Sequence, residues 1–600
     1  MSVSLTPLGT VRRRLGAPEP KATPFPERLV HAARASDVGE ETLYLSWELA
    51  RSATDLEPEE REALLSVAVA SLNSLERGST HLPLDRLAER LRYFGADDAL
   101  VARAETLMEE PRALIGRPGD YKPLIIDDGR LYHQRVHQQE VSLARNLKAR
   151  LEAKSDRSQY MKILDALDRV LAHRAVVNGR VVRLSAEQQD AVRTAVTRAL
   201  SVVSGGPGTG KTSVVVAILR VLARLEVAMA NVALAAPTGR AARRMAESVQ
   251  GALGAVPEPK IVDGGILETL PEARTLHRLL GYSPAGGRFR HDEANPLPYA
   301  LVIVDEASMI DLELMDRLLR ALRPQTQLVL LGDADQLPSV HAGAVLGDIV
   351  SACEKRGSIV LRENYRVDRK DAAGRALAEA FRSIQTEDFH TLMKSIAVRR
   401  QASEVAFHGV ELLEEDHEGF LVRWMSERVM PASYLELVRR EPFDAGAALG
   451  HLRRHGMLAV TSHDAERINE TCRRRHPSRR GEPILVTRND YERGLFNGER
   501  GVISGISASG VHFETGATDA LREDLSTAYA ITVHKSQGAE YDHVAVWLPS
   551  YDHPLLTREL LYTAMTRARK SVTLVGSKEA VSAGFGRALE RTTGILSRLA

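Results

Sequence analysis

The spacing of apolar and polar residues divides this chain into segments of different type. Before residue 115, leucines and valines recur at helical spacing between charged stretches and Pro/Gly breaks, which predicts a helical region. From residue 184 onward, short apolar runs alternate with longer amphipathic segments. These runs are residues 201–204, 232–236, 301–304, 328–331 and 572–575. Short buried strands that alternate with helices are typical of parallel sheets built from βαβ units, so we expect an α/β fold.

A different pattern occupies residues 483–525. Short β-prone runs at 484–487, 501–506 and 511–513 are separated by glycines and by the turn signal Asn497-Gly498. This pattern predicts a small all-β module inserted into the second α/β region.

Composition sets the broad class. The chain has 600 residues, of which 44% are hydrophobic and 26% charged, as in an ordinary soluble globular protein of about three or four domains. Its 80 Lys and Arg nearly balance 79 Asp and Glu, so any nucleic-acid track must be a local stripe of charge.

Cysteines and targeting signals narrow the class further. Cys353 and Cys472 are far apart and lack metal-ligand spacing, so we expect neither a disulfide framework nor a zinc or iron–sulfur site. Arg12-Arg13-Arg14 is not followed by an apolar signal region, and no apolar run is long enough to cross a bilayer. We expect a cytoplasmic protein with no membrane partner.

One glycine-rich loop carries the strongest chemical signal. It completes the pattern G-x-x-x-x-G-K-[ST] between an apolar strand and a helical pattern, with the residues Gly205, Gly206, Pro207, Gly208, Thr209, Gly210, Lys211 and Thr212. Glycines let backbone amides surround phosphates, and the helix N-terminus attracts the anion. We expect a bound nucleoside triphosphate, with Lys211 on its β- and γ-phosphates, Thr212 on Mg²⁺ and Ser213 also at the site. The flanking strand and helix disfavour a chance match in a glycine-rich turn.

A second element ends in two carboxylates. The apolar strand at 299–304 leads to Asp305 and Glu306, at the sheet edge where open α/β sheets bind ligands. We expect Asp305 to bind Mg²⁺ through its coordination shell and Glu306 to polarise the attacking water. Alone, this pair is equally consistent with a strand-end cap; the phosphate loop favours the functional interpretation. Gln336, after strand 328–331, is placed to sense the γ-phosphate, although its segment alone would be interpreted as a turn.

The ordered motifs resemble those of one family. They are Leu184-Ser185 with Gln188, the phosphate loop, 236–242, 304–309, 332–338, Tyr365-Arg366, 532–538 and 562–569. Their order resembles superfamily-one DNA helicases, and more narrowly the RecD-type branch, the alpha subunit of exodeoxyribonuclease V. The resemblance implies two RecA-like parallel-sheet P-loop motor domains that clamp ATP and Mg²⁺. It also implies a helical partner-docking domain at 1–117, a first motor domain with linker at 118–362, and a second at 363–600 carrying a small β-barrel at about 481–526.

The resemblance also assigns residues to the nucleotide. Arg366 and Arg567 are expected to reach from the far side of the cleft as arginine fingers that neutralise charge on the γ-phosphoryl group. Gln188 is expected to read the adenine edge, and Gly538 and Glu540 to lie at the nucleotide. Tyr365 is expected to stack on the base, with a buried core tyrosine as the alternative.

DNA contacts follow from the same resemblance. It places six residues near single-stranded DNA, where they would hold phosphates without reading sequence: Thr238, Arg240, His277, His534, Lys535 and Ser536. Aromatic residues are 5% of the chain, so base stacking is not expected to be the main hold. The Arg-rich stretch 473–480 is a further candidate patch, or more simply a solvated face. Segment 281–298 is a candidate hairpin at the duplex junction, or a passive surface loop.

The function implied is an ATP-dependent 5′-to-3′ DNA helicase subunit of a RecBCD-type helicase-nuclease in double-strand break repair. Its partners would be single-stranded and duplex-end DNA and RecB-like and RecC-like subunits in a heterotrimer. Residues 78–84, 123–125 and 131–132 resemble the docking region, and no nuclease site is expected. The alternatives are a stand-alone RecD-like helicase and a non-translocating ATP-gated DNA-binding module; the pair Arg366 and Arg567 argues against the latter.

Overall fold

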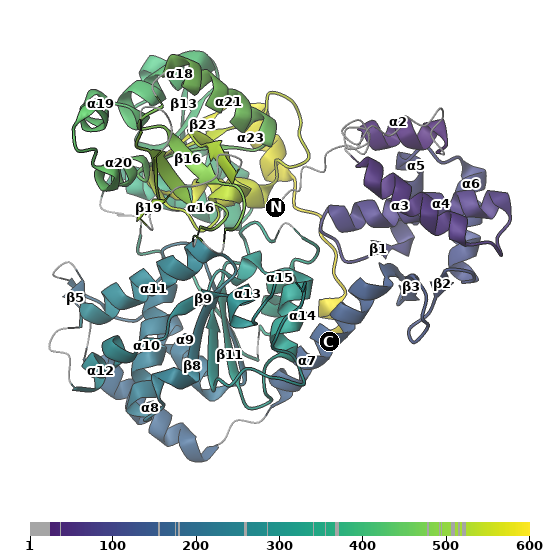
Figure 1. The fold of residues 1–600 in the computed structure, drawn as a ribbon, viewed down its shortest axis with the longest axis horizontal. Coiled ribbons are helices and arrows are strands. Elements are labelled where there is room, and N and C mark those ends of the chain that lie inside the picture. The colour runs from purple at the N-terminus through teal and green to yellow at the C-terminus, as the bar shows by residue number, and fades with distance from the viewer. Residues whose placement is uncertain are drawn as a thin grey trace.

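A computed structural model of the chain describes residues 25–599 with gaps. The gaps are 36–37, 154–156, 174–175, 178–179, 257–260, 285, 340, 355, 367–370, 477–478, 491–492, 494, 506–509, 514–515 and 519–523. Arg12-Arg13-Arg14 and the end of the predicted run 501–506 lie outside the described residues. Figure 1 shows two α/β lobes, one above the other, with a mainly helical unit beside them. Among the helices of the described ranges, none is long and apolar enough to span a bilayer.

The first lobe contains a six-stranded parallel sheet in the order β12-β7-β11-β10-β8-β9. Its strands are β7 (Leu200–Gly205), β8 (Val232–Ala236), β9 (Ala273–Thr275), β10 (Leu301–Val304), β11 (Gln327–Gly332) and β12 (Ser358–Leu361). Its helices include α9 (Ala186–Thr197), α10 (Lys211–Arg224), α11 (Gly239–Gly254), α12 (Ile261–Thr269), α13 (Leu276–Leu279), α14 (Leu312–Arg320) and α15 (Val345–Ala352).

Both faces of this sheet are buried, which explains its continuous apolar strands. Because successive side chains of a strand point to opposite faces, Val202 and Val302 belong to one hydrophobic core and Val203 and Ile303 to the other. The predicted strands 201–204, 232–236, 301–304 and 328–331 all lie in this sheet, so the expected parallel α/β fold is confirmed.

The second lobe repeats this architecture. Its six-stranded parallel sheet has the order β13-β14-β23-β22-β15-β21. The strands are β13 (Ile396–Arg399), β14 (Gly409–Leu413), β15 (His455–Ala459), β21 (Ala530–Thr532), β22 (Tyr541–Trp547) and β23 (Ala568–Val575). The helices are α16 (Ala372–Gln385), α17 (Phe389–Ser395), α18 (His417–Trp424), α19 (Ala432–Arg439), α20 (Ala445–Leu452), α21 (Ser462–Arg475), α22 (Arg558–Met565) and α23 (Lys578–Gly586).

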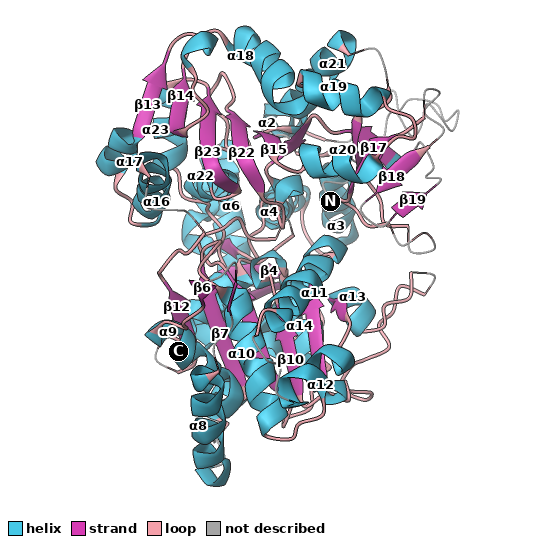
Figure 2. Ribbon diagram, turned by 90° about the vertical axis from the view of Figure 1, so that its left-hand side faces the viewer, coloured by secondary structure: helices cyan, strands magenta, loops and turns pink. Residues whose placement is uncertain are grey.

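The predicted β module is present as a five-stranded antiparallel sheet in the order β19-β18-β17-β16-β20. Figure 2 shows β17, β18 and β19 side by side at the edge of the second lobe. Its strands are β16 (Pro483–Val486), β17 (Arg500–Ile503), β18 (Val511–Phe513), β19 (Gly516–Thr518) and β20 (Leu525–Thr527). Among the described residues the two end strands are not paired with each other. Closure into a barrel therefore stays a prediction.

The N-terminal unit is less purely helical than predicted. Helices α2 (Glu27–Ala35), α3 (Glu40–Ser52), α4 (Pro58–Glu76), α5 (Leu87–Tyr93) and α6 (Asp98–Glu109) pack on a four-stranded sheet. Its strands are β1 (Leu82–Pro83), β2 (Ile115–Gly116), β3 (Leu124–Asp127) and β4 (Arg130–His133). Leu124 and Leu131 share one hydrophobic core with the helices, so this core continues past the expected boundary at residue 117. Helices α7 (Gln134–Glu152) and α8 (Arg157–Ala172) and the hairpin β5 (Val176–Val177) and β6 (Arg180–Val181) then lead to the first lobe.

The C-terminal tail leaves the second lobe and returns to the other two units (Figure 1). The Thr592 carbonyl accepts from Thr80 N at 2.9 Å, and Arg598, in α24 (Ile595–Leu599), pairs with Asp127 at 2.6 Å. The fully buried carboxylate of Glu140 on α7 accepts from Gly594 N at 2.9 Å. Ile595 and Leu599 of the tail belong to the hydrophobic core of the first lobe. The tail therefore fastens the N-terminal unit to the first lobe, an arrangement that the sequence did not predict.

Candidate functional site

The glycine-rich loop joins β7 to α10 in the predicted way. Gly208 and Gly210 have φ of +85° and +83°, a left-handed conformation that glycine adopts without strain. Lys211 Nζ donates to the carbonyls of Gly205 at 2.5 Å and Gly206 at 3.2 Å. The lysine is thereby held over the loop whose amides face the start of α10, the arrangement that suits a phosphate group. Thr212 and Ser213 follow in the first turn of α10, and Ser213 lines a cavity of about 190 Å³ between α8, α9 and α10.

Asp305 and Glu306 follow β10 at the same edge of the sheet. Burial and the charge of Glu306 raise the pKa of Asp305, and the nearby Lys211 opposes this shift. Glu306 has φ of +52°, an uncommon conformation for a residue with a side chain, and begins the 3-10 turn η3 (Ala307–Met309). Such strained positions concentrate at functional sites. A carboxylate whose charged form is disfavoured by burial, at the sheet edge that also carries the phosphate loop, fits the oxygen ligand set of Mg²⁺.

Gln336 and Arg567 connect the two lobes. The Gln336 amide donates to Asp333 Oδ2 at 2.9 Å, and its carbonyl oxygen accepts a hydrogen bond from Arg567 Nη2. Arg567 is only 2% exposed and also donates to the carbonyls of Thr563 at 3.2 Å and Ala539 at 3.4 Å. Burial lowers the pKa of Arg567, and the charges of Glu306 and Asp333 oppose this shift. Arg567 therefore points into the cleft, toward the carboxylates of the first lobe.

The segment that carries Arg366 lies directly on the phosphate loop. Asn364 Nδ2 donates to the Pro207 carbonyl at 2.9 Å, and Tyr365 N donates to the Gly208 carbonyl at 2.8 Å. The expectation that Arg366 reaches from the far side of the cleft is therefore wrong for its backbone, which follows β12 of the first sheet. The side chain crosses the cleft instead and pairs with Glu540 at 2.6 Å.

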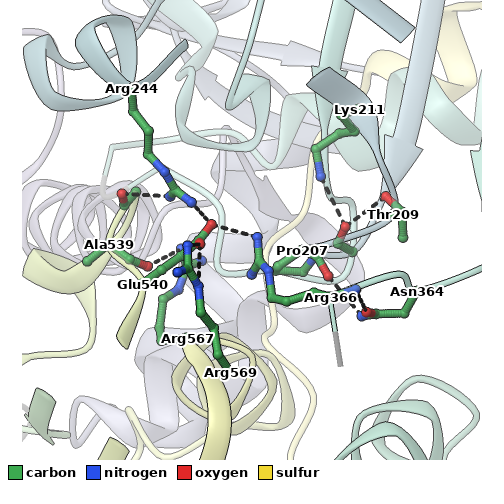
Figure 3. A network of polar contacts seen from close by, with 12 residues as sticks. Pro207, Thr209, Lys211, Arg244, Asn364, Arg366, Ala539, Glu540, Arg567 and Arg569 are labelled. Atoms are coloured by element: carbon green, nitrogen blue, oxygen red, sulfur yellow. Dashed lines mark hydrogen bonds and ion pairs between the residues drawn. The ribbon is translucent and has the colours of Figure 1, made fainter. Parts of the chain in front are cut away.

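Glu540 is the centre of an arginine cluster (Figure 3). Its carboxylate pairs with Arg366 and with Arg569, each at 2.6 Å, and with Arg244 of α11. Arg244 also donates to the Gly538 carbonyl at 3.0 Å. Burial and the neighbouring arginines lower the pKa of Arg366 to about 9, and its Nη1 is buried with no hydrogen-bond partner among the described residues. The cluster has an excess of positive charge that an added anion would neutralise.

Gln188 and Tyr365, both expected at the nucleotide base, differ in burial: Gln188 is buried and Tyr365 is exposed. Gln188 is 3% exposed, accepts from Ser185 N at 3.0 Å and donates to the Thr209 carbonyl at 2.9 Å, so its amide braces the phosphate loop. Tyr365 is 50% exposed, and its hydroxyl donates to Glu363 at 2.7 Å. The alternative of a buried core tyrosine is therefore wrong.

Three of the expected DNA contacts share one edge of the first sheet. Thr238 caps α11 by accepting from Ala241 N at 3.2 Å, and Arg240 lies in the first turn of α11. His277 lies in α13, which follows β9, the parallel neighbour of β8. Its ring packs on those of Tyr282 and Phe289, and burial lowers its pKa.

The other three lie in the turn η7 (His534–Ser536) of the second lobe. Lys535 is exposed, whereas Ser536 is fully buried and donates to the Val533 carbonyl at 2.6 Å. The expectation that Ser536 contacts DNA is not supported by this position. Burial lowers the pKa of His534 to about 4, so this imidazole is neutral at pH 7 and offers hydrogen bonding rather than charge.

Two weaker candidate segments have simple structures. In the Arg-rich stretch, the exposed Arg474 pairs with the exposed Glu470, as in a solvated face. Arg479 pairs with the buried Glu482, and the largely buried Arg480 pairs with Glu441, so the solvated-face interpretation fits only part of the stretch. Its residues 477–478 lie outside the described part of the chain. In segment 281–298, an antiparallel bridge joins Ser283 and Arg288, residue 285 lies outside the described residues, and the duplex contact stays a prediction.

Comparison with known proteins agrees with this architecture. Residues 188–342 match a family model described as an AAA domain, and residues 527–575 match a UvrD-like helicase C-terminal domain. The RecBCD enzyme subunit RecD of Mycolicibacterium smegmatis is 39% identical over 436 residues, which cover 69% of this chain and 74% of that protein. This chain belongs to the RecD family. The RecD subunit of Haemophilus influenzae is 30% identical, with 68% of this chain and 71% of that protein covered.

A longer relative matches an equal share of this RecD-family chain. The ATP-dependent RecD2 DNA helicase of Deinococcus radiodurans is 33% identical over 430 residues, which cover 69% of this chain and 52% of that protein. Pif1 helicase from Bacteroides in complex with ADP-AlF3 and ssDNA is 18% identical, with a TM-score of 0.38 and coverage of 65% of this chain and 92% of that one. The RecD relatives and the two matched domains identify an ATP-hydrolysing DNA helicase, so the predicted enzyme class is confirmed.

Sequence reasoning missed Arg244 and Asn364 and left Arg569 without a role. Arg244 had one signal, its spacing of four residues from Arg240, which places both on one face if the segment is helical. Its partner Glu540 lies almost 300 residues later in the chain, and only the assembled lobes show the pair.

Proposed function

We propose that this RecD-family helicase is the 5′-to-3′ motor subunit of a RecBCD-type helicase-nuclease. It would process duplex DNA ends in the cytoplasm, assembled with RecB-like and RecC-like subunits. The similarity to relatives supports a subunit over a stand-alone motor, because the RecD subunit of Mycolicibacterium smegmatis is 39% identical and the RecD2 helicase of Deinococcus radiodurans is 33% identical.

The observation that carries the proposal is the contact between Gln336 of the first lobe and Arg567 of the second, beside the phosphate loop. ATP with Mg²⁺ supplies the hydrolysable γ-phosphoryl group when bound. Lys211 holds the phosphates, Thr212 and Asp305 bind the metal ion, and Glu306 positions and deprotonates the attacking water. Arg567 and Arg366 neutralise charge that develops at the γ-phosphoryl group, so closure of the lobes completes the site.

DNA would be held by both lobes at the expected track. Thr238, Arg240 and His277 offer a hydroxyl, a guanidinium and an imidazole on the first lobe, and Lys535 is an exposed cation on the second. These groups suit phosphate contacts without sequence reading. Changes in the distance between the lobes would then move one grip relative to the other along the strand.

Most of the docking residues expected near the N-terminus are buried within the chain itself, and Pro123 is the exposed one among them. Gly78 O accepts from Gly343 N at 2.8 Å, and His81 and Tyr132 are buried. We therefore place the partner surface on the outside of this unit, where Leu45 and Tyr121 are exposed apolar side chains.

The test is purification from the native host followed by unwinding assays on duplexes with either a 5′ or a 3′ single-stranded tail. We expect nuclease and scaffold subunits to co-purify, and we expect the tail preference of this motor to be 5′. A complex with Lys211→Gln in this chain separates its contribution from that of a partner motor. Purification as an active monomer supports the stand-alone alternative, and a 3′ preference lost in Lys211→Gln contradicts the proposed polarity.

A further inference from the structure

Helix α11 carries residues of the proposed DNA track at its N-terminus and, one turn later, an arginine that contacts the second lobe. Thr238 and Arg240, at its N-terminus, belong to the proposed DNA track, and Arg244 follows one turn later. Residues four apart on a helix lie above one another on the same face. The positive charge of Arg240 contributes to lowering the pKa of Arg244, as expected for two guanidinium groups at close range. Arg244 therefore moves with the part of the first lobe that faces DNA.

Arg244 reaches the nucleotide cleft of the opposite lobe. It pairs with the Glu540 carboxylate (Figure 3). It also donates to the Gly538 carbonyl at 3.0 Å. Burial lowers the pKa of Arg244 to about 10, and the charge of Glu306 opposes the shift, so Arg244 also lies within electrostatic range of the proposed catalytic base.

Glu540 connects Arg244 to the phosphate loop. Its carboxylate is 9% exposed and accepts from Arg366 at 2.6 Å, and the backbone of Arg366 lies on Gly208. A buried carboxylate shared by several guanidinium groups cannot keep all bonds unchanged when one partner moves. A shift of α11 therefore changes how firmly Glu540 holds Arg366 beside the phosphates.

We propose that Arg244 is a positioning residue that couples DNA binding to ATP turnover through Glu540 and Arg366. DNA phosphates that bind the start of α11 set the position of Arg244, and this sets the position of Arg366 at the γ-phosphate. The inference rests on the proposed DNA track and adds a specific route from the track to the cleft. ATP hydrolysis as such does not depend on it.

Helix α11 supplies a matched control. The adjacent Arg243 also forms an ion pair across the lobes, with Glu499 of the β module at 3.2 Å, and it does not contact Glu540. Arg243→Gln therefore removes the same charge from the same helix, and also breaks an interlobe pair, while leaving the Glu540 cluster intact.

The experiment measures ATP turnover by the purified protein with and without saturating oligothymidylate, and oligothymidylate affinity separately. The variants are Arg244→Gln, Arg244→Lys, Arg243→Gln, Glu540→Gln and the double variant Arg244→Gln/Glu540→Gln. We expect Arg244→Gln to lower the stimulation of kcat about tenfold, the effect of a coupling of about 1.4 kcal/mol. Arg244→Lys should restore part of the stimulation, and Arg243→Gln should keep it.

The double variant tests the route itself. If stimulation passes through the pair, the double variant is no worse than the more defective single variant, whereas independent effects multiply. The inference is overturned if Arg244→Gln keeps full stimulation at saturation, if it changes only DNA affinity, or if Arg243→Gln loses stimulation equally. A wild-type turnover that ignores oligothymidylate would overturn the proposed DNA function as well, and so is distinguishable from failure of the coupling alone.

Discussion

Replacing Gly208 by alanine is expected to displace the segment that carries Arg366 from the phosphate loop. A second glycine variant then measures the effect of backbone strain alone. At Gly208, with φ of +85°, an added Cβ would overlap the Arg366 side chain and lie 3.0 Å from Asn364 Oδ1. Segment 364–366 must then move off the loop and lose two hydrogen bonds, Asn364 to Pro207 at 2.9 Å and Tyr365 to Gly208 at 2.8 Å. At about 1 kcal/mol each, their loss lowers kcat/KM for ATP about 30-fold.

Gly498 provides the control for this variant. Its φ of +87° is nearly the same, and an added Cβ meets nothing within 4 Å. Gly498→Ala therefore introduces the same strain of about 1 to 2 kcal/mol without the clash. We expect it to lower the melting temperature slightly and leave kcat/KM for ATP unchanged with saturating single-stranded DNA. Equal kcat/KM for Gly208→Ala and wild type would refute the placement of segment 364–366 on the working phosphate loop.

Two further predictions concern the metal site and the DNA track. Because the raised pKa of Asp305, to about 6, makes this carboxyl gain a proton as the pH falls, Mg²⁺-dependent binding of a fluorescent ATP analogue should weaken below about pH 6. Glu306→Gln removes one cause of the raised pKa of Asp305, so the weakening of nucleotide binding should move to lower pH. The same variant should lower kcat about 10² to 10⁴-fold. An unshifted pH profile would argue against the coupling of the two carboxyls. Lys535→Gln should reduce the slope of log affinity for single-stranded DNA against log salt by about 1. The control is Lys570→Gln, which should leave the slope unchanged because Lys570 Nζ pairs with Asp542 at 2.8 Å. Equal slopes for both variants would remove Lys535 from the DNA track.

The sequence predicted the elements whose signal is local. Strands such as β7 and β10 are buried on both faces, so their continuous apolar runs and the helices between them reveal the parallel sheets. Strands β1 and β2 have only two residues each, too few to show any alternation, and the N-terminal sheet was therefore missed. The return of Arg598 to Asp127 joins residues 471 positions apart, and no periodicity encodes such a contact.

The site was predictable to the same limit. The loop around Lys211 and the pair Asp305 and Glu306 could be predicted because each is a run of consecutive residues at the end of an apolar strand. The predicted position of the Arg366 backbone was wrong because a sequence motif does not show where one lobe ends and the next begins. Ser536 was assigned by motif order, yet the turn of η7 directs its hydroxyl to a backbone carbonyl. Contacts between lobes depend on assembly and not on spacing.

The central claim is that residues of both lobes act together on one triphosphate. Single-turnover hydrolysis of ATP by Arg567→Gln, at saturating single-stranded DNA and with nucleotide binding measured in parallel, tests it most directly. We predict a rate reduced about 10³-fold or more while nucleotide binding is kept, because the arginine acts on charge that develops during the reaction. Hydrolysis at the wild-type rate would contradict the claim.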